Sequence, residues 1–364
     1  MTGQEAMTGP EAMTGPEAMI DLGAYRRNID LLRSRVAPAQ LMAVVKADGY
    51  GHGLLPVARA AVAAGVGWIG ALDVATALQL RAGDGGGGIR DEILIFTWML
   101  GPTEDYAAAV AASVDLGVSA VEQLDRIADA AVTSRARIHL KIHTGLHRNG
   151  ASAEHWPSLV ARALELHDRL DLVGVWTHIA EASEQDDSDA ISRFHEAIAV
   201  AEGLGAAFTV RHLSASAAAF SRADARFDLV RIGAFSYGIA PGGGVTPTSL
   251  GLEPVMTLRA PVVTVHSGIA ELGIGFGDGI PTSAAGVMTV RIGRYRYLIN
   301  SIGLENLTIA VGDAPIRPGD EAVLFGAGQL GEATMQEWGD ALGTIGEEIV
   351  TRVGPRIPRI YSET

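Results

Sequence analysis

The sequence contains no cysteine and almost no lysine. Without thiols the chain has no disulfide, no thiolate nucleophile, no Cys-ligated zinc and no iron–sulfur cluster. Its only lysines are Lys46 and Lys141, so any chemistry that needs a side-chain primary amine has two candidates. Positive charge is scarce as well, because 28 Lys and Arg residues face 42 Asp and Glu residues and leave a net charge of −14. This acidity argues against nucleic acid or an anionic membrane as a partner.

Long hydrophobic runs are also missing. The least polar stretch, residues 54–72, is interrupted by Arg59 and three glycines, and it predicts a buried helix–turn–strand rather than a membrane span. The N-terminus repeats a hexapeptide (MTGQEA, MTGPEA, MTGPEA) before Met19, without the apolar core or the basic start of a signal peptide. We therefore expect residues 1–18 to be a disordered extension and the protein to be cytoplasmic.

Between residues 41 and 232, eight short apolar runs alternate with segments of helical periodicity. Eight successive β/α units favour an α/β fold, a closed (β/α)8 TIM barrel over residues 19–240, with an open doubly wound sheet as the alternative. The predicted strands are Leu41–Val45, Trp68–Leu72, Glu92–Phe96, Val114–Val118, Arg137–Ile142, Leu172–His178, Thr209–Leu213 and Leu229–Ile232. The predicted helices include Leu54–Ala64, Val74–Arg81, Ser119–Ala131, Ala153–His167 and Ile191–Leu204.

The pattern changes near residue 240. Residues 241–364 have few helical windows and several β-type runs separated by Gly and Pro turns, which predicts a mainly-β C-terminal domain. Two domains also agree with a chain of 364 residues, of which 48% are hydrophobic and 19% charged. The predicted strands of this domain are Val255–Val265, Gly286–Ile292, Leu307–Val311, Glu321–Phe325 and Ile349–Val353.

Lys46 directly follows the first predicted strand and precedes a Gly-rich turn, residues 47–53. A barrel carries its chemistry at the carboxyl ends of its strands, and a lysine at that place is positioned to form a Schiff base. An ordinary surface lysine at a strand end would produce the same local pattern. Both interpretations are open at this point.

Around Lys46 the sequence resembles the alanine racemase family of pyridoxal-phosphate (PLP) enzymes, which combine a barrel with a β domain. Val45-Lys46-Ala47 and Tyr50-Gly51-His52-Gly53 match the family's PLP-lysine motif. The segment beginning at Met19 and two later blocks, Lys141–Gly150 and Trp176–Ala180, match in order along the predicted barrel. The resemblance implies an isomerase in which Lys46 holds PLP as an internal aldimine and acts as one catalytic base.

The resemblance also assigns roles to residues beside the cofactor. Arg148 matches an arginine next to the phenolic oxygen of PLP and the substrate carboxylate, and His178 matches a histidine that packs near the ring. Lys141 matches a structural lysine, sometimes carbamylated, that helps to orient the arginine. A cluster of basic side chains beside the cofactor is the expected result.

Phosphate sites of barrels often follow strands seven and eight. Those loops contain the hydroxyl of Ser216 and the backbone of Gly233 and Ala234, which can bind an anion. The resemblance assigns these residues, together with Tyr50, to the PLP phosphate, and it places Arg231 at the ring nitrogen. A permanently charged arginine disfavours protonation of that nitrogen and so favours simple proton movement over side reactions. The alternative for Arg231 is an ordinary ion pair at a strand end.

Three histidines offer a competing interpretation. His139, Lys141 and His143 share one face of a predicted strand, and His147 follows. A metal site made of His139, His143 and His147 is conceivable, but no carboxylate lies nearby in the sequence. We predict a basic cluster and no metal.

The resemblance breaks down at the second catalytic base. The family uses a tyrosine from the partner subunit's β domain, within a Gly/Ser-Tyr-Gly turn, where this chain has Gly275-Phe276-Gly277. In a second alignment the tyrosine-bearing turn is deleted. Either alignment leaves the base missing, since Phe276 neither donates nor accepts a proton.

These observations predict a PLP-dependent racemase or epimerase for a small amino acid, working as a homodimer with shared active sites. One alternative is another Cα or Cβ reaction on the same scaffold, such as aldol-type cleavage or deprotonation on one face, with His178 or His147 as base. A second alternative is a non-catalytic PLP-binding protein.

Overall fold

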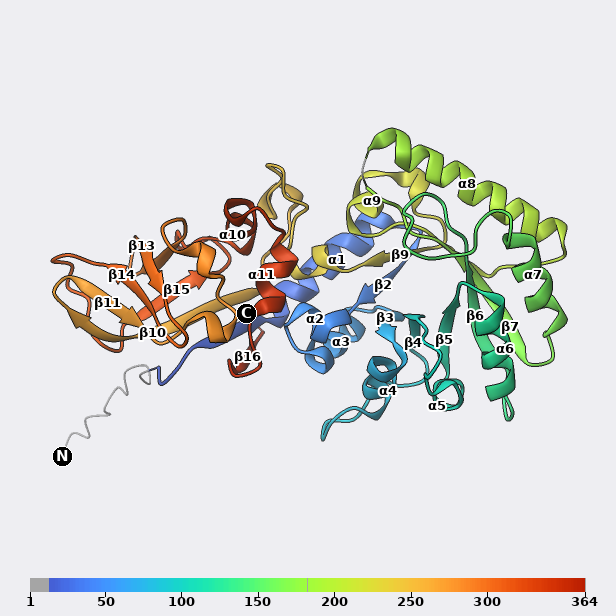
Figure 1. Ribbon diagram of the computed structural model, residues 1–364, viewed down its shortest axis with the longest axis horizontal. Coiled ribbons are helices and arrows are strands. Elements are labelled where there is room, and N and C mark those ends of the chain that lie inside the picture. The colour runs from blue at the N-terminus through green and yellow to red at the C-terminus, as the bar shows by residue number, and fades with distance from the viewer. Residues whose placement is uncertain (1–12, 182, 364) are drawn as a thin grey trace, which may run out of the picture. The chain divides into compact units, whose positions relative to one another are not determined.

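The computed structural model describes residues 13–181 and 183–363, so most of the predicted extension, residues 1–12, lies outside the described residues. The chain divides into two compact units (Figure 1). The barrel unit is Tyr25–Gly238, and the β unit combines the N-terminal segment up to Ala24 with Ile239–Thr364. Within the described residues, no helix is long and apolar enough to cross a membrane.

The barrel unit is built on eight parallel strands in the order β8-β7-β6-β5-β4-β3-β2-β9. Backbone bonds from Asp228 N to Arg211 O (3.1 Å) and from Arg231 N to Ser214 O (3.2 Å) join the two ends of this order. The predicted barrel followed by a β domain is therefore confirmed, and the open sheet is wrong. The strands are β2 (Gln40–Val44), β3 (Trp68–Asp73), β4 (Leu94–Met99), β5 (Val114–Val118), β6 (Ala136–Lys141), β7 (Leu170–Trp176), β8 (Val210–His212) and β9 (Leu229–Ile232).

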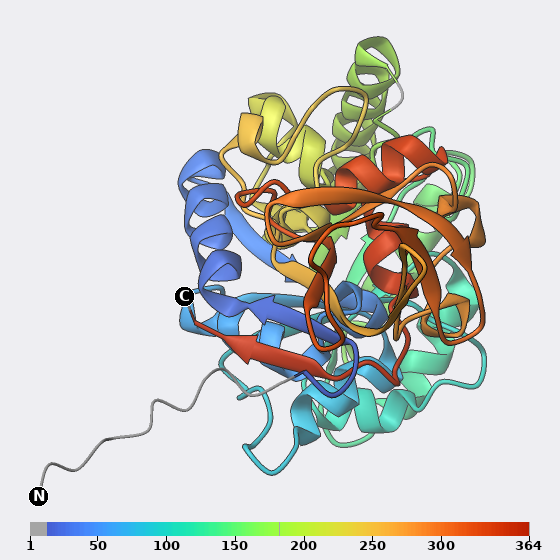
Figure 2. The same ribbon diagram turned by 90° about the vertical axis from the view of Figure 1, so that its left-hand side faces the viewer.

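Helices surround these strands (Figures 1 and 2). Each buries one stripe of side chains, as α6 does with Leu124, Ile127 and Ala128. Helix α1 was not among the predicted helices, although Ile29, Leu32 and Val36 follow helical spacing and are fully buried. The helices are α1 (Leu22–Val36), α2 (Lys46–Tyr50), α3 (Leu54–Ala63), α4 (Val74–Ala82), α5 (Tyr106–Ala111), α6 (Val121–Ala130), α7 (Trp156–Glu165), α8 (Glu184–Gly203) and α9 (Ser216–Ser221).

The β unit is a second eight-stranded sheet, in the order β11-β14-β13-β12-β15-β10-β1-β16. Strand β1 pairs antiparallel with β10 and parallel with β16, beside which it lies in Figure 2. Glu17 and Ala18, which the sequence analysis places in the extension, begin β1. The strands are β1 (Glu17–Asp21), β10 (Met256–His266), β11 (Ile269–Leu272), β12 (Thr289–Ile292), β13 (Tyr295–Ile302), β14 (Leu307–Ala310), β15 (Glu321–Phe325) and β16 (Arg359–Ser362).

The strand predicted at Ile349–Val353 is wrong. This segment lies in helix α11 (Gly346–Arg352), which follows α10 (Met335–Leu342). The helix buries Ile349 and Val350, and Glu348 forms an ion pair with Arg352 one turn later. Packing of a helical face overrides the β preference of the branched residues here.

Candidate active site

The predicted site residues of the barrel unit lie where its strands end. This is the edge of a barrel at which side chains from different strands meet. Lys46 follows β2, Arg148 lies in the loop after β6, His178 follows β7, Ser216 opens α9 after β8, and Gly233 and Ala234 follow β9. Folding of the barrel thus brings together residues that are spread over nearly two hundred positions of the sequence.

His178 is surrounded by cationic side chains. Its imidazole is largely buried, and burial lowers its pKa far below the usual range. The positive charges of Arg231, Lys141, Arg148 and Lys46 lower the pKa further. His178 is therefore neutral at physiological pH, and the cations predicted for the site lie close enough to act on it.

Lys141 holds His178 in place. Its Nζ donates to His178 Nδ1 at 3.0 Å and to the side-chain oxygen of Asn149, and it lies 4.3 Å from the centre of the Trp176 ring. Burial, followed by the charges of Arg231 and Arg148, lowers the pKa of Lys141 to about 7. Its amine is thus partly neutral near pH 7, which reduces repulsion within the cluster.

Arg231 is a buried cation with only 4% of its surface exposed. Its Nη2 donates to the carbonyl oxygens of Thr177 (2.8 Å) and Leu213 (2.9 Å), and its Nη1 donates to His212 Nδ1 (3.0 Å). Burial lowers the pKa of Arg231 to about 9, and Arg148 contributes in the same direction. The guanidinium still carries its charge at neutral pH, with its orientation set by three bonds rather than by an ion pair.

The backbone after Lys46 forms one left-handed turn. Five successive residues, Ala47 to Gly51, have φ between 52° and 78°. Asp48 Oδ1 accepts from Leu54 N at 2.7 Å and closes the turn. Each non-glycine residue in this conformation costs about 1–2 kcal/mol, and such strain concentrates at functional sites. The turn places Lys46 Nζ 5.5 Å from the centre of the Tyr50 ring.

The residues predicted to bind phosphate gather at one point. Gly233 N donates to Ser216 Oγ at 3.2 Å. The Tyr50 hydroxyl lies so close to Gly233 that a Cβ there would meet it at 2.2 Å. We call Tyr50, Ser216 and Gly233 the hydroxyl cradle. It gathers two hydroxyls at the backbone of Gly233, whose N–H donates to Ser216 Oγ, and hydroxyls can donate to an anion.

Three buried polar atoms on or just after barrel strands have no hydrogen-bond partner among the described residues. They are Thr97 Oγ1, Trp176 Nε1 and Ser214 Oγ. Leaving such an atom unpaired typically costs about 1–3 kcal/mol.

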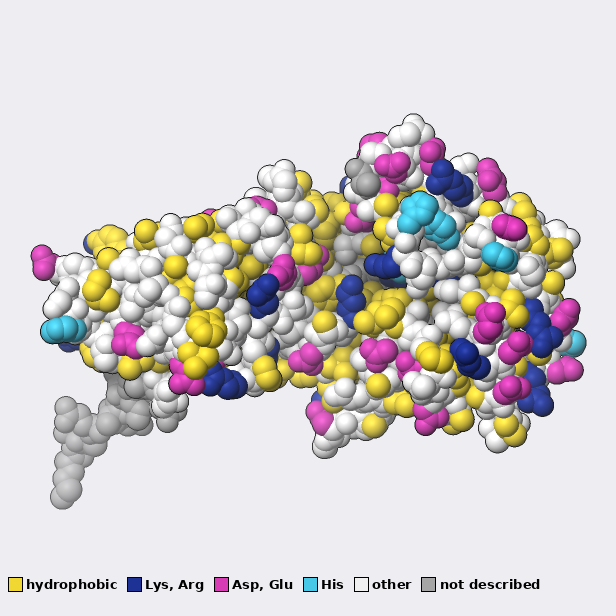
Figure 3. All heavy atoms as spheres, in the orientation of Figure 1, with side chains coloured by type: hydrophobic (Ala, Val, Ile, Leu, Met, Phe, Trp, Pro, Cys, Tyr) yellow, Lys and Arg dark blue, Asp and Glu magenta, His cyan; other side chains and the backbone are white. Residues whose placement is uncertain are grey.

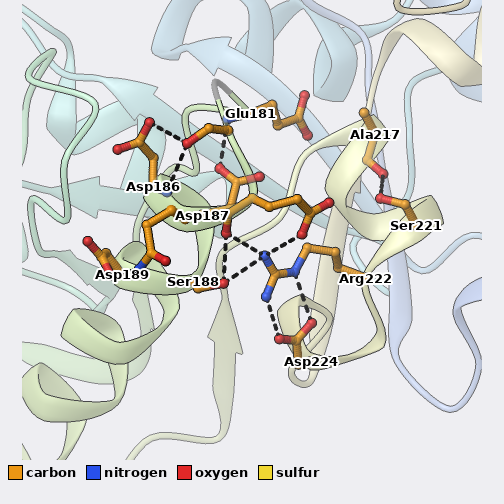
Figure 4. A network of polar contacts seen from close by, with 12 residues as sticks. Glu181, Asp186, Asp187, Ser188, Asp189, Ala217, Ser221, Arg222 and Asp224 are labelled. Atoms are coloured by element: carbon orange, nitrogen blue, oxygen red, sulfur yellow. Dashed lines mark hydrogen bonds and ion pairs between the residues drawn. The ribbon is translucent and has the colours of Figure 1, made fainter.

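A polar network that the sequence analysis missed holds the loop after β7 to α9 (Figure 4). Glu181 Oε1 accepts from Ala218 N at 2.8 Å, and Glu181 N donates to Asp187 Oδ1 at 3.0 Å. Arg222 forms ion pairs with Glu184 (3.2 Å) and Asp224 (2.7 Å). The network connects the loop that carries His178 with the helix that begins at Ser216. Its sequence signal was the acidic run after Ser183, which caps α8.

Phe276 belongs to the β unit. It opens a short 3-10 turn, Phe276–Asp278, and its side chain is 48% exposed. Asp278 Oδ2 accepts from Gly275 N at 3.0 Å, and the backbone N–H groups of Phe276 and Gly277 donate to the carbonyls of Gly303 and Leu304. These hydrogen bonds fix the backbone of the turn, and the Phe276 ring remains about half exposed.

The three histidines considered for a metal site are not brought together. His139 is buried and bonds to Asp115 and His212, whereas the rings of His143 and His147 stack edge-on with centres 4.5 Å apart. Histidine side chains gather in one patch on the face of the barrel unit shown in Figure 3. Among the described residues, no group of three or more His, Asp or Glu side chains could hold a metal ion.

The fold and the site define a class of protein: a (β/α)8 barrel with an appended β unit, whose lysine, buried cations and hydroxyl cradle gather at the strand ends. The family model described as "Alanine racemase, N-terminal domain" matches residues 20–241. The model described as "Alanine racemase, C-terminal domain" matches residues 255–361. The chain belongs to the alanine racemase family.

Relatives similar to this chain carry the same name. The alanine racemase of Thermobifida fusca is 42% identical over 371 residues, which cover 94% of this chain and 97% of that protein. The solved structure of alanine racemase from Streptomyces coelicolor has a TM-score of 0.92 and 38% identity, covering 96% of this chain and 98% of that one. That of alanine racemase from D-cycloserine producing Streptomyces lavendulae has a TM-score of 0.92 and 36% identity, covering 97% and 98%. The similarity spans both units.

Proposed function

We propose that this protein is a PLP-dependent racemase of alanine or another small amino acid. The observation that carries the proposal is the gathering of Lys46, the hydroxyl cradle and the buried cations at one end of the barrel, in a chain of the alanine racemase family. A homodimer with shared active sites and a cytoplasmic location belong to the same proposal.

The residues present fit PLP. The hydroxyl cradle, with the backbone of Ala234, would hold the phosphate, and Lys46 would supply the amine that binds the cofactor. Arg231 would face the ring nitrogen as a donor, and neutral His178 would pack near the ring. When bound, PLP withdraws electrons from an amino acid and makes its Cα proton acidic.

The side chains of this chain would bind the substrate and move the proton. Arg148 is exposed, so its guanidinium can pair with the substrate carboxylate. Lys46 Nζ would remove or return the Cα proton on one face. Lys141 would hold His178 through its bond to Nδ1 and, because of its low pKa, would add little repulsion. These roles follow from position and charge.

Phe276 favours a second candidate function. If it occupies the place of the family's second base, proton return on the opposite face requires a substitute group or water. General acid–base catalysis typically contributes about 10²–10⁴-fold to the rate, so a chain without this group would be a slow racemase. The alternatives are an aldol-type cleavage or one-face deprotonation on the same scaffold, and a non-catalytic PLP-binding protein.

One experiment separates these functions. The purified protein is reconstituted with PLP, and L-alanine, D-alanine or L-serine is added in deuterated buffer. Exchange and configuration at Cα are then followed. Exchange with inversion supports racemisation, and exchange without inversion supports one-face chemistry. Loss of exchange with all amino acids, while PLP still binds, would reject both enzymatic functions. The absorbance of bound PLP should disappear in Lys46→Ala, and its persistence there would reject Lys46 as the binding lysine.

A further inference from the structure

A chain of hydrogen bonds runs through the closed interior of the barrel, from Arg231 to Asp115. Arg231 Nη1 bonds to His212 Nδ1 at 3.0 Å, and His212 Nε2 bonds to His139 Nδ1 at 2.9 Å. His139 Nε2 bonds to Asp115 Oδ2 at 3.0 Å. Asp115, His139 and His212 are fully buried. We call these four residues the buried relay.

The chemistry at the two ends fixes every proton in between. A guanidinium only donates, so His212 Nδ1 must accept and His212 carries its proton on Nε2. That proton goes to His139 Nδ1, so His139 also carries its proton on Nε2. A carboxylate only accepts, which matches the last bond. One tautomer of each histidine satisfies the chain, and both rings remain neutral.

Asp115 is anchored at the far end. Arg137 binds it through two parallel bonds, Nε to Oδ1 at 2.7 Å and Nη2 to Oδ2 at 3.0 Å. Burial raises the pKa of Asp115, but the hydrogen bonds from His139 and Arg137, together with the positive charge of Arg137, outweigh burial and bring the pKa below its ordinary value. The carboxylate is therefore ionised although its side chain is fully buried.

The neighbouring strands leave room for the His139 ring. Its cross-strand partners on β5 and β7 are both glycines, Gly117 and Gly174. A Cβ at Gly174 would lie 2.3 Å from His139 Nδ1. The Phe96 ring lies 4.8 Å from the His139 ring, and the Trp176 ring is parallel to His212 at 5.7 Å. The rings of Phe96 and Trp176 and the two glycines thus give His139 and His212 a tightly packed, apolar surrounding.

We propose that Asp115 and His139 are positioning residues that act through His212 to fix the orientation of the Arg231 guanidinium in the active-site wall. The proposal rests on the proposed function insofar as Arg231 faces the cofactor. Without the carboxylate, the histidines lose the acceptor that selects their tautomers. The opposite tautomer of His212, with its proton on Nδ1, then becomes available and cannot accept from Arg231 Nη1. In that tautomer the guanidinium loses one of its three hydrogen bonds.

The first test uses the full chain without cofactor. Imidazole ¹⁵N NMR should show the proton of His139 and that of His212 on Nε2. In Asp115→Asn the amide offers both a donor and an acceptor, so the Nε2-H preference of both rings should be lost. Gly174→Ala, which displaces the His139 ring without altering any charge, should give the same result. Unchanged tautomers in both variants would overturn the proposal.

The second test uses the protein loaded with PLP. Since outer partners that orient an active group are typically worth about 10–100-fold, kcat should fall by that factor in Asp115→Asn and Gly174→Ala while KM changes little. The pH profile of the bound cofactor's absorbance should shift in both. Arg135→Gln is the control, because Arg135 precedes β6 and pairs with Asp171 at the surface. If Arg135→Gln lowered kcat by the same factor, the losses in Asp115→Asn and Gly174→Ala would reflect a general structural effect and not the orientation of Arg231. If the wild-type protein does not bind PLP, the proposed function is wrong. The NMR experiment on the cofactor-free chain still tests the role of the buried relay.

Discussion

The charge of Lys141 is sensitive to pH near neutrality, because burial and two arginines lower its pKa from 10.5 to about 7. Between these values the unfolded chain holds a proton that the folded chain has released. The free energy of unfolding should therefore rise with pH in this window, by up to about 1.4 kcal/mol per pH unit from this group. Below pH 7 both states are protonated and the contribution is constant.

We predict that Lys141→Met, which removes the titrating amine, flattens this pH dependence. Urea unfolding midpoints of both proteins between pH 7 and 10 would measure it. Titrating groups distant from Lys141 are present in both proteins and cancel in the comparison. The same rise with pH in the variant would show that Lys141 is not the source.

Ser216 is predicted to contribute directly to cofactor affinity. Hydrogen bonds to charged groups are worth about 1.5–3 kcal/mol, so Ser216→Ala should weaken PLP binding roughly 10–100-fold. Ser221→Ala is the matched control, since that hydroxyl lies at the other end of α9 and donates to Ala217 O. Fluorescence titration with PLP would measure both, and equal affinities would exclude Ser216 from the phosphate site.

Residue types and their spacing predicted much of this site. Lys46, Arg148 and His178 could be named from motifs, and the structure places the charges of Lys46 and Arg148 close enough to lower the pKa of His178. The relay could not be predicted, because no sequence motif links Asp115 in β5 with His139 in β6. Their partners are defined only by the register of neighbouring strands.

Among the elements, the left-handed turn after β2 depends on a glycine. Gly49 has φ of +60°, and a Cβ there would lie 2.6 Å from Val57 Cγ2. We predict that Gly49→Ala destabilises the protein by about 1–3 kcal/mol and moves Lys46, with loss of PLP binding. Gly67→Ala is the control, because no atom lies within 4 Å of its Cβ position. Chemical denaturation would measure both; equal stability would contradict a strained turn.

Elements with a strong local pattern were predictable, and those decided by distant partners were not. The eight barrel strands were predicted within a few residues because each is a short apolar run. The run Ile349–Val353 is equally apolar but forms a helix, since its buried face is set by packing. Strand β1 is five residues long and pairs with β10, far along the chain, which no local pattern indicates.

At the scale of the whole molecule, Phe276 is the residue that we expect to limit the return of the proton to Cα on the face opposite Lys46. If the β unit of one copy completes the site of another, Phe276→Tyr should speed racemisation by about 10²–10⁴-fold with little change in KM. Tyr361→Phe serves as the control, because that exposed tyrosine of β16 is not assigned to the site. Conversion of L-alanine to D-alanine would be measured. A rate that Phe276→Tyr does not raise would show that another group already serves the second face.

By itself, the sequence determined the fold class and the family and limited the candidate amines to two, because these depend on periodicity, ordered motifs and the presence of only two lysines. The tertiary structure decided the rest. It lowered the pKa of Lys141 to about 7 and placed the Tyr50 hydroxyl beside Gly233. It also linked Arg231 to Asp115 by hydrogen bonds through two histidines. These properties arise from burial and from contacts between distant strands, so they exist only once the barrel has closed.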